Sequence, residues 1–288
     1  AQIALAWPGF SIPFIISRDY TIPRFVSEKT MFIASSYSGN TEETLEALGQ
    51  AEAMGAYIVI IASGGKLAAL AQEKNYPLLL LPAVSQPRYA TLYGFKALLT
   101  ILVKIGILDE ANTATTISQA TEMLQATTAL WRPDIATKHN YAKQIALEVI
   151  GKSVVVYGGP LTYPAAYKWK ISFNENAKNV AWVNQYPEFN HNEFIGWTSH
   201  PFDKTYAVID LRSNLEHSQV QKRFAVSAKL LSGRRPSPIV VEAEGSTLLN
   251  QLLWLIALGD FVSIYTALLN GINPTPVDLI EKLKKELS

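Results

Sequence analysis

The chain has 288 residues, of which 49% are hydrophobic and 17% charged, so it can bury a sizeable core and is not a disordered segment. Its 25 basic and 24 acidic residues nearly cancel, which gives no electrostatic case for binding nucleic acid. Cysteine is absent, which excludes disulfides, thiolate catalysis and cysteine-ligated metals and fits a cytoplasmic enzyme.

The first half of the sequence alternates short apolar runs with helical ones. Leu45, Leu48 and Ala51 have helical spacing within residues 41–54, and a shorter helix follows at residues 67–71. The alternation predicts a parallel sheet with right-handed crossovers. Its strands are expected at residues 31–35, 57–62 and 77–81, and a long, largely buried helix at residues 88–105.

The second half resumes the same alternation after a helical stretch at residues 112–150, which contains no strand-like run. We therefore expect two α/β halves, residues 1–130 and 131–288. Strands are expected at residues 153–157, 206–211 and 238–241, and helices at residues 164–177, 216–231, 246–270 and 275–287.

Neither a membrane span nor a signal peptide is expected. The longest apolar tracts, residues 97–107 and 248–258, are interrupted or too short to cross roughly 30 Å of hydrocarbon. The N-terminus lacks the charged region of a signal peptide. The chain opens in mid-pattern without Met, and its first half has no counterpart of the strand and glycine pair, Gly158-Gly159, that open the second. We therefore expect an N-terminal piece to be missing.

The most informative local motif is SYSGNTEET, residues 36–44, between a predicted strand and a predicted helix. Ser36, Ser38 and Thr41 supply hydroxyl groups, and Gly39 lets the backbone bend closely around a ligand. Backbone N–H groups at the start of a helix favour an anion. No lysine lies in the turn, so it is not a Walker-type nucleotide loop. A phosphate monoester held without metal fits it, and an ordinary capped turn is the alternative.

This turn resembles the Ser-x-Ser-Gly-x-Thr turn of the sugar isomerase (SIS) domain superfamily, and the resemblance extends over both halves. It implies two SIS-type, flavodoxin-like α/β sandwich subdomains with parallel sheets. It also implies that Ser36, Ser38 and Thr41 bind the 6-phosphate of a sugar. The superfamily's Gly-Gly-Ser segment on the first strand has no counterpart here.

The second half contains two polar segments, FNEN at residues 173–176 and YPEFNHNE at residues 186–193. Aldose–ketose isomerisation needs a base that moves a proton between C1 and C2, an acid/base for ring opening and a cation near the developing oxyanion. Glu175 and His191 have suitable chemistry, although a solvated glutamate and a surface histidine are the simpler interpretations of each alone. No metal-ligand spacing lies near them.

Together these segments resemble the bifunctional phosphoglucose/phosphomannose isomerases, a subgroup of the superfamily. The resemblance implies that Glu175 transfers the proton and that His191, supplied by the partner subunit of a dimer, assists ring opening. Arg88, otherwise readable as a surface arginine, corresponds to the arginine that stabilises the enediolate. Thr275 and Lys282 correspond to the threonine linked to tolerance of both C2 epimers and to the lysine near the ring oxygen. No cofactor or metal is implied.

A homodimer with shared active sites is expected on a second ground. Large aromatic residues crowd the loop-like sequence around His191, and their polar neighbours argue against a dry core, which leaves an interface. These aromatic residues are Trp182, Tyr186, Phe189, Phe194 and Trp197.

Other activities also fit the phosphate turn. They are an amino-sugar phosphate isomerase, a hydrolase of sugar-phosphate derivatives and a non-catalytic phosphosugar-binding regulator. Against a regulator that binds DNA, the sequence has no recognisable DNA-binding segment. The expected partners are therefore a small sugar phosphate and a second copy of the chain, with neither nucleic acid nor membrane.

Overall fold

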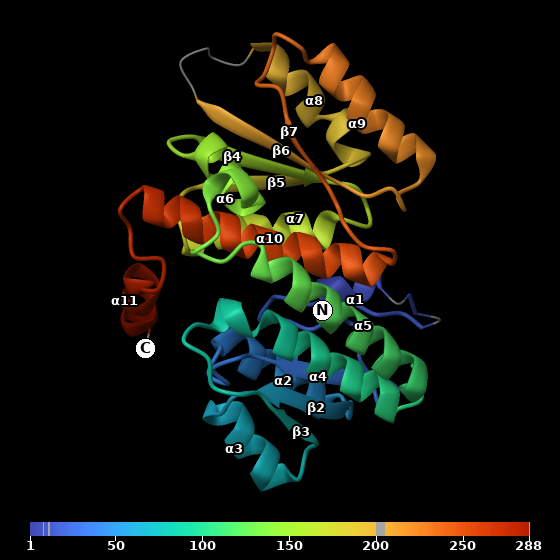
Figure 1. Ribbon diagram of the computed structural model, residues 1–288. Coiled ribbons are helices and arrows are strands. Elements are labelled where there is room, and N and C mark those ends of the chain that lie inside the picture. The colour runs from blue at the N-terminus through green and yellow to red at the C-terminus, as the bar shows by residue number, and fades with distance from the viewer. Residues whose placement is uncertain (8, 11, 200–204, 288) are drawn as a thin grey trace. The chain divides into compact units, whose positions relative to one another are not determined.

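The computed structural model describes residues 1–7, 9–10, 12–199 and 205–287, and the chain divides into two compact units. The first unit comprises residues 1–5 and 9–114, and the second comprises residues 6–8 and 115–288. Each unit contains a parallel sheet with helices packed on it, which confirms the predicted α/β class (Figure 1). The domain boundary expected at residues 130/131 stays a prediction, because compactness alone does not define a folding domain.

The first unit contains a three-stranded sheet in the order β1-β2-β3, with both pairs parallel. β1 (Met31–Ser35) and β2 (Tyr57–Ala62) have the predicted bounds, and β3 (Leu78–Leu80) is shorter than predicted. The long helix expected at residues 88–105 is a 3₁₀ turn, η1 (Pro87–Ala90), followed by α4. The helices of this unit are α2 (Glu42–Ala53), α3 (Gly65–Lys74) and α4 (Thr91–Lys104). Two helices have residues in both units, α1 (Gln2–Ala6) and α5 (Glu110–Ala129).

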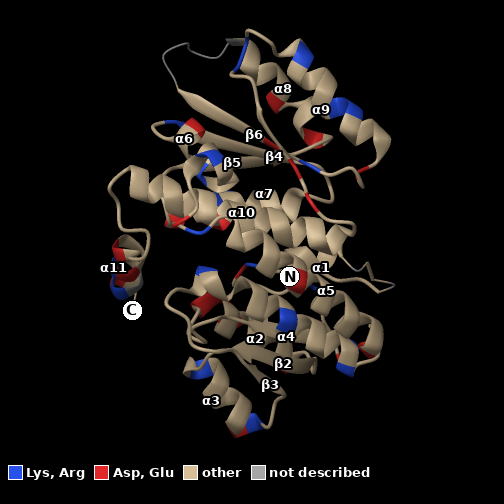
Figure 2. Cartoon of the chain, in the orientation of Figure 1, with Lys and Arg blue, Asp and Glu red and all other residues tan. Residues whose placement is uncertain are grey.

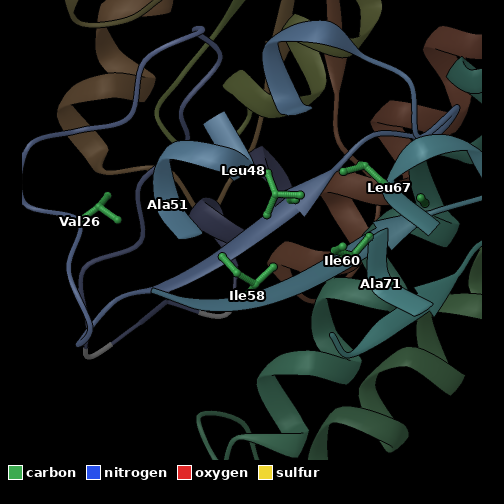
Figure 3. Close-up of a cluster of buried hydrophobic side chains, with 9 residues drawn as sticks. Val26, Leu48, Ala51, Ile58, Ile60, Leu67 and Ala71 are labelled. Atoms are coloured by element: carbon green, nitrogen blue, oxygen red, sulfur yellow. The ribbon is translucent and has the colours of Figure 1, made fainter. Parts of the chain in front are cut away.

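The core of the first unit forms between one face of the sheet and the helices α2 and α3 (Figure 3). Alternate residues of a strand point to the same face, so Ile58 and Ile60 both enter this cluster. Leu48 of α2 and Leu67 of α3 meet them and are fully buried. Each such side chain contributes roughly 1.5–3 kcal/mol through removal from water. This packing fixes the start of α2, which carries the predicted phosphate turn.

The second unit contains a four-stranded parallel sheet in the order β5-β4-β6-β7. The second strand of the unit lies outside the first, as in flavodoxin-like doubly wound sheets. The strands are β4 (Ser153–Gly158), β5 (Ala181–Gln185), β6 (Tyr206–Arg212) and β7 (Ile239–Glu242). β5 was not predicted, because its five residues end in Asn184 and Gln185 and carry too short an apolar run.

Helices cover both faces of the second sheet (Figure 1). Val155 and Tyr157 of β4 pack with Val220 and Phe224 of α9, whereas α7 contacts β4 and β5 from the other side. The longer helices of this unit are α6 (Tyr141–Val149), α7 (Tyr163–Glu175), α9 (Ser218–Leu230), α10 (Leu248–Leu269) and α11 (Asp278–Leu287). Short elements are η2 (Thr137–His139), η3 (Glu188–His191), α8 (Glu193–Gly196) and η4 (Trp197–Ser199).

The apolar tract at residues 248–258 is only part of the apolar helix α10. This helix has 22 residues and is long and apolar enough to cross a membrane, so the tract is not too short. In the folded chain, however, 67% of its most apolar stretch is buried, and it packs against α6 and α7. Trp169 of α7 lies directly on Gly259 and donates a hydrogen bond of 2.6 Å to the carbonyl of Leu255. α10 is therefore the central core helix of the second unit.

The aromatic residues around His191 also differ from expectation. Tyr186, Phe189 and Trp197 belong to the core cluster of the second unit, and Phe194 is partly buried against it. Only Trp182 is half-exposed. The interpretation of this group as an interface is therefore wrong, because η3 and α8 fold back over the sheet and place the aromatic rings inward. Their polar neighbours remain at the rim, where they form hydrogen bonds.

Candidate functional site

The turn at residues 36–41 connects β1 directly to α2 in the first unit. Ser36 is buried, and its Oγ shares a hydrogen bond of 2.6 Å with Oγ1 of Thr41. Thr41 occupies the N-cap position of α2, but its side chain does not cap the helix. Ser38 is exposed at the tip of the turn. The three predicted phosphate-binding residues thus lie together at the N-terminal end of one helix.

The start of α3 supports this turn from beside it. Gly39 has a φ of 69°, and a Cβ on it would lie 1.9 Å from the carbonyl oxygen of Gly64. A Cβ on Gly65 would lie 2.3 Å from the carbonyl oxygen of Ser38, and the N–H of Lys66 donates to Oδ1 of Asn40 at 2.9 Å. Only glycine permits such close backbone contact at a positive φ. No local pattern in the sequence indicates this supporting role of Gly64 and Gly65, because it depends on contact between two separate helix starts.

Several donors at this turn are available to a ligand. The backbone N–H groups of Ser38, Glu42 and Glu43 have no acceptor within the described part of the chain. They lie at the positive end of α2, which favours an anion. The turn can therefore offer backbone donors together with hydroxyl groups to a phosphate.

Arg88 lies in η1 of the same unit and is 5% exposed, so its interpretation as a surface arginine is wrong. Its guanidinium lies over the ring of Tyr89 at 4.9 Å, and Nη1 donates to Gln86 at 3.4 Å. The phosphate turn is tied to the segment that precedes η1, since the hydroxyl of Tyr37 accepts the N–H of Val84 at 2.7 Å.

Glu175 is the last residue of α7 in the second unit, and both neighbouring asparagines are anchored. Asn174 accepts the N–H of Ala181, the first residue of β5, at 3.0 Å. Asn176 is fully buried and donates to Oγ of Ser263 on α10 at 2.9 Å. The FNEN segment is thus fixed to β5 on one side and to α10 on the other, while Glu175 remains partly exposed.

Thr275 lies near the end of α7, because Lys178 joins the two segments. Nζ of Lys178 donates to the carbonyl of Glu175 at 2.5 Å and to that of Pro274 at 3.0 Å. The predicted helix at residues 275–287 begins only at Asp278. Thr275 precedes Pro276, and a residue before proline is disfavoured in helical conformation.

Lys282 lies on α11 and is exposed. This helix carries charges of both signs, and Figure 2 shows that charged residues are scattered over both units in the described part of the chain. Leu279, Leu283 and Leu287 lie on one side of α11 and are 80%, 58% and 69% exposed. Lys282 is therefore presented on an amphipathic helix with an exposed apolar face.

His191 ends η3 and is exposed, whereas the residues on either side are held. Asn190 donates to Oγ of Ser227 on α9 at 2.9 Å. Glu193 accepts from Asn184 of β5 at 2.7 Å. The NHNE segment therefore has a fixed backbone on which the imidazole is exposed.

Glu193 also accepts a hydrogen bond from the buried hydroxyl of Tyr157. Burial, and then the negative charge of Glu193, raise the pKa of Tyr157 far above its ordinary value, so the phenol stays protonated. Trp197 donates to the same hydroxyl at 3.1 Å. These groups form a hydrogen-bond network that holds Glu193, two residues after His191.

A second strand-to-helix turn, residues 158–162, joins β4 to α7. It binds the side-chain carboxylate of a residue that is distant in sequence, Glu216. Oε1 of Glu216 accepts the N–H groups of Leu161 and Thr162 at 2.8 and 3.2 Å. A Cβ on Gly159 would lie 2.3 Å from that oxygen. Burial raises the pKa of Glu216, and the two backbone donors oppose this shift. Sequence analysis missed Glu216, although Gly158-Gly159 at the start of a helix was the available signal.

Comparison with known proteins gives the family. The family described as "Bacterial phospho-glucose isomerase C-terminal SIS domain" matches residues 138–287. A bifunctional phosphoglucose/phosphomannose isomerase from Caldicellulosiruptor bescii is 35% identical over 280 residues, which cover 96% of this chain and 82% of that protein. The chain belongs to the family of bifunctional phosphoglucose/phosphomannose isomerases.

Two further similarities are more distant. A D-glucosamine-6-phosphate 4-epimerase from Sulfolobus acidocaldarius is 34% identical over 189 residues, covering 65% of this chain and 57% of that protein. The crystal structure of a glucose-6-phosphate isomerase like protein from Thermus thermophilus matches with a TM-score of 0.59 at 18% identity. It covers 96% of this chain and 90% of its own, and supports the fold. The predicted family and fold are thus confirmed, while the individual site residues stay predictions.

Proposed function

We propose that this chain interconverts glucose 6-phosphate, and mannose 6-phosphate, with fructose 6-phosphate by proton transfer through an enediolate. The likeness to bifunctional phosphoglucose/phosphomannose isomerases over 96% of the chain carries the proposal. The phosphate turn and the anchored FNEN and NHNE segments give that chemistry suitable groups. An aldose–ketose isomerisation is redox-neutral within one molecule, so the proposal includes no cofactor.

In this proposal the turn at residues 36–41 binds the 6-phosphate. The hydroxyls of Ser36, Ser38 and Thr41 and the backbone donors at the start of α2 supply the contacts. Binding the phosphate fixes one end of the substrate, so the energy gained there is available to orient the reacting carbons.

Glu175 moves the proton between C2 and C1. Its carboxylate takes the C2 proton of the open-chain aldose and returns it to C1, while a second proton passes from the C2 hydroxyl to the former aldehyde oxygen. Arg88 stabilises the negative charge of the enediolate. Lys282 acts near the ring oxygen, and Thr275 contacts the C2 side of the substrate.

We also propose a homodimer in which His191 opens the sugar ring in the partner's site. The exposure of His191 on a fixed backbone supports this role, because an imidazole that acts on another chain must project outward. Mixing inactive Glu175→Gln chains with inactive His191→Ala chains tests it. Activity should return, since one site of the mixed dimer is intact. If subunit exchange occurs without recovery, the shared site is wrong.

The cellular setting completes the proposal. We place the enzyme in the cytoplasm, with a sugar phosphate and a second copy as partners and with neither nucleic acid nor membrane. The absence of cysteine and the buried position of α10 in the second unit support this setting.

The direct test is conversion of glucose 6-phosphate or mannose 6-phosphate to fructose 6-phosphate by the purified chain. Both substrates should react, and the rate should be the same with and without EDTA, because no metal is proposed. Binding of both sugar phosphates without conversion would instead indicate a phosphosugar-binding regulator.

Similarity to the Sulfolobus 4-epimerase favours one further candidate, an enzyme that acts on an amino-sugar phosphate. Glucosamine 6-phosphate serves as the discriminating substrate. Turnover of this compound in preference to glucose 6-phosphate would replace the proposed activity.

A further inference from the structure

We propose that Lys178 is a positioning residue that clamps the end of α7 to the turn before α11, and so fixes Glu175 relative to Thr275. The inference rests on the proposed function, in which these two residues act on the same C2 carbon. It arises from three features of Lys178: its backbone conformation, the carbonyls that it contacts and the stiffness of the segments that it joins.

The backbone of Lys178 is in the left-handed region, with a φ of 53°. Among the described residues other than glycine, only Asn75 shares a positive φ. Asparagine tolerates this region and glycine adopts it freely, whereas a lysine there is strained. A strained backbone persists where the surrounding contacts compensate for it, and such positions concentrate at functional sites.

Part of the compensation is the chain reversal after α7, in which the N–H of Asn179 donates to the carbonyl of Phe173 at 3.2 Å. The ammonium group of Lys178 adds two further contacts. It donates to the carbonyl of Glu175 at 2.5 Å and to that of Pro274 at 3.0 Å. The first is the carbonyl of the last residue of α7, where a cation also interacts favourably with the helix dipole. Hydrogen bonds from a charged donor are stronger than neutral ones. Glycine at this position would relieve the strain but would remove the bridge.

Both segments that Lys178 joins are stiff. On the α7 side, Asn176 is buried and bonded to Ser263 of α10. On the other side, the N–H of Thr275 donates to Oδ1 of Asn273 at 2.9 Å, and prolines at 274 and 276 restrict the backbone. A bridge between two stiff segments sets their separation, whereas a bridge to a flexible loop would not.

The clamp therefore affects the choice between C2 epimers. Glucose 6-phosphate and mannose 6-phosphate differ in configuration at C2, where Glu175 exchanges the proton and Thr275 makes contact. A shift of Thr275 relative to Glu175 changes the fit of one epimer more than that of the other. Loss of the clamp should thus change the ratio of the two kcat/KM values as well as their size.

The test compares Lys178→Gly, Lys178→Arg and, as a matched control, Lys222→Met on the exposed face of α9. We expect Lys178→Gly to keep or raise Tm, because the strain is relieved. Its kcat/KM should fall about tenfold for the better epimer, and the epimer ratio should change at least threefold. Lys178→Arg should keep kcat/KM and the epimer ratio close to those of the parent chain, since it retains a cationic donor. Lys222→Met should match the parent chain.

Hydrogen exchange at residues 272–277 gives a readout that does not depend on catalysis. Exchange there should accelerate in Lys178→Gly and remain slow in Lys178→Arg and Lys222→Met. Unchanged exchange in Lys178→Gly would overturn the clamp, even if the parent chain proved inactive. Faster exchange with an unchanged epimer ratio in an active enzyme would overturn the positioning role. An inactive parent chain that shows the predicted exchange pattern would refute the proposed function alone.

Discussion

The turn after β1 and the turn after β4 have the same local form, a strand that passes through a glycine-containing turn into a helix. They differ in what faces the helix start. At residues 158–162 the carboxylate of Glu216 accepts the N–H groups of Leu161 and Thr162. At residues 36–41 hydroxyl groups surround the helix start, and no carboxylate of the described residues accepts its backbone donors.

This difference separates the roles of the two units. A helix start that already binds an internal carboxylate has no donors left for a phosphate, so the start of α7 cannot bind phosphate in the way proposed for the start of α2. Instead, it carries Glu175 at the opposite end of the same helix, α7. Under the proposed function the two units therefore have different roles, with phosphate binding assigned to the first and proton transfer to the second.

The largest effect is expected from Glu175→Gln, which retains the shape of the side chain and removes its basicity. Turnover should fall by about 10²–10⁴-fold, and KM should change little because the proposed phosphate site lies in the first unit. Steady-state kinetics with glucose 6-phosphate measure both constants. A variant with near-normal kcat would remove Glu175 from the proton-transfer role.

Next in size is Phe189→Ala, which tests the packing beneath His191. Phe189 is fully buried among Tyr157, Tyr186 and Phe194, so the truncation should cost about 3–5 kcal/mol of unfolding free energy. Trp182→Ala is the matched control, because Trp182 is half-exposed and should cost much less. Urea denaturation measures both. Equal costs would contradict the assignment of these aromatic residues to core and surface.

A smaller effect is expected from Gly39→Ala in the phosphate turn. The new Cβ would meet a backbone oxygen at 1.9 Å, and the φ of 69° disfavours alanine, so the turn must open. KM should rise by about tenfold or more, which corresponds to roughly 1.4 kcal/mol of lost binding. Gly49→Ala is the control, since nothing lies within 4 Å of its Cβ in α2. An unchanged KM in Gly39→Ala would place the phosphate elsewhere.

The smallest effect concerns the pH dependence of stability at the second turn. Burial raises the pKa of Glu216 above its ordinary value of 4.5 in the folded chain. Its contribution is therefore fully present below the unfolded pKa and is lost as pH rises through the folded pKa. Glu216→Gln keeps an acceptor oxygen but cannot ionise, so Tm should decline less than in the parent chain between pH 4 and 8. Parallel Tm profiles would show that Glu216 does not titrate as proposed.

Several elements follow from local sequence alone. β1 and β2 have the predicted bounds, because each is a short run of apolar residues between turn signals. The phosphate turn was located from Ser36, Gly39 and Thr41 between a strand and a helix. Such features depend on neighbours within about ten residues, and the sequence displays them directly.

Other elements required neighbours that are distant in sequence. β5 carries too little apolar character to be recognised, but its parallel pairing with β4 makes it a strand. The aromatic residues around His191 have the composition of an interface, and only the return of η3 and α8 over the sheet places them in the core. The length of α10 likewise became interpretable once its burial against α6 and α7 was known.

The sequence by itself determined the α/β class, the position of the turn proposed to bind phosphate and the family resemblance, because periodicity and short motifs are local properties. Tertiary structure decided which polar groups are buried or hydrogen-bonded within the chain and which remain accessible to a ligand. It buried Arg88, placed the carboxylate of Glu216 across the second helix start and joined Glu175 to Pro274 through Lys178. The physical reason is that burial, backbone strain and hydrogen bonds over 50 or more residues depend on packing, and no local pattern encodes them.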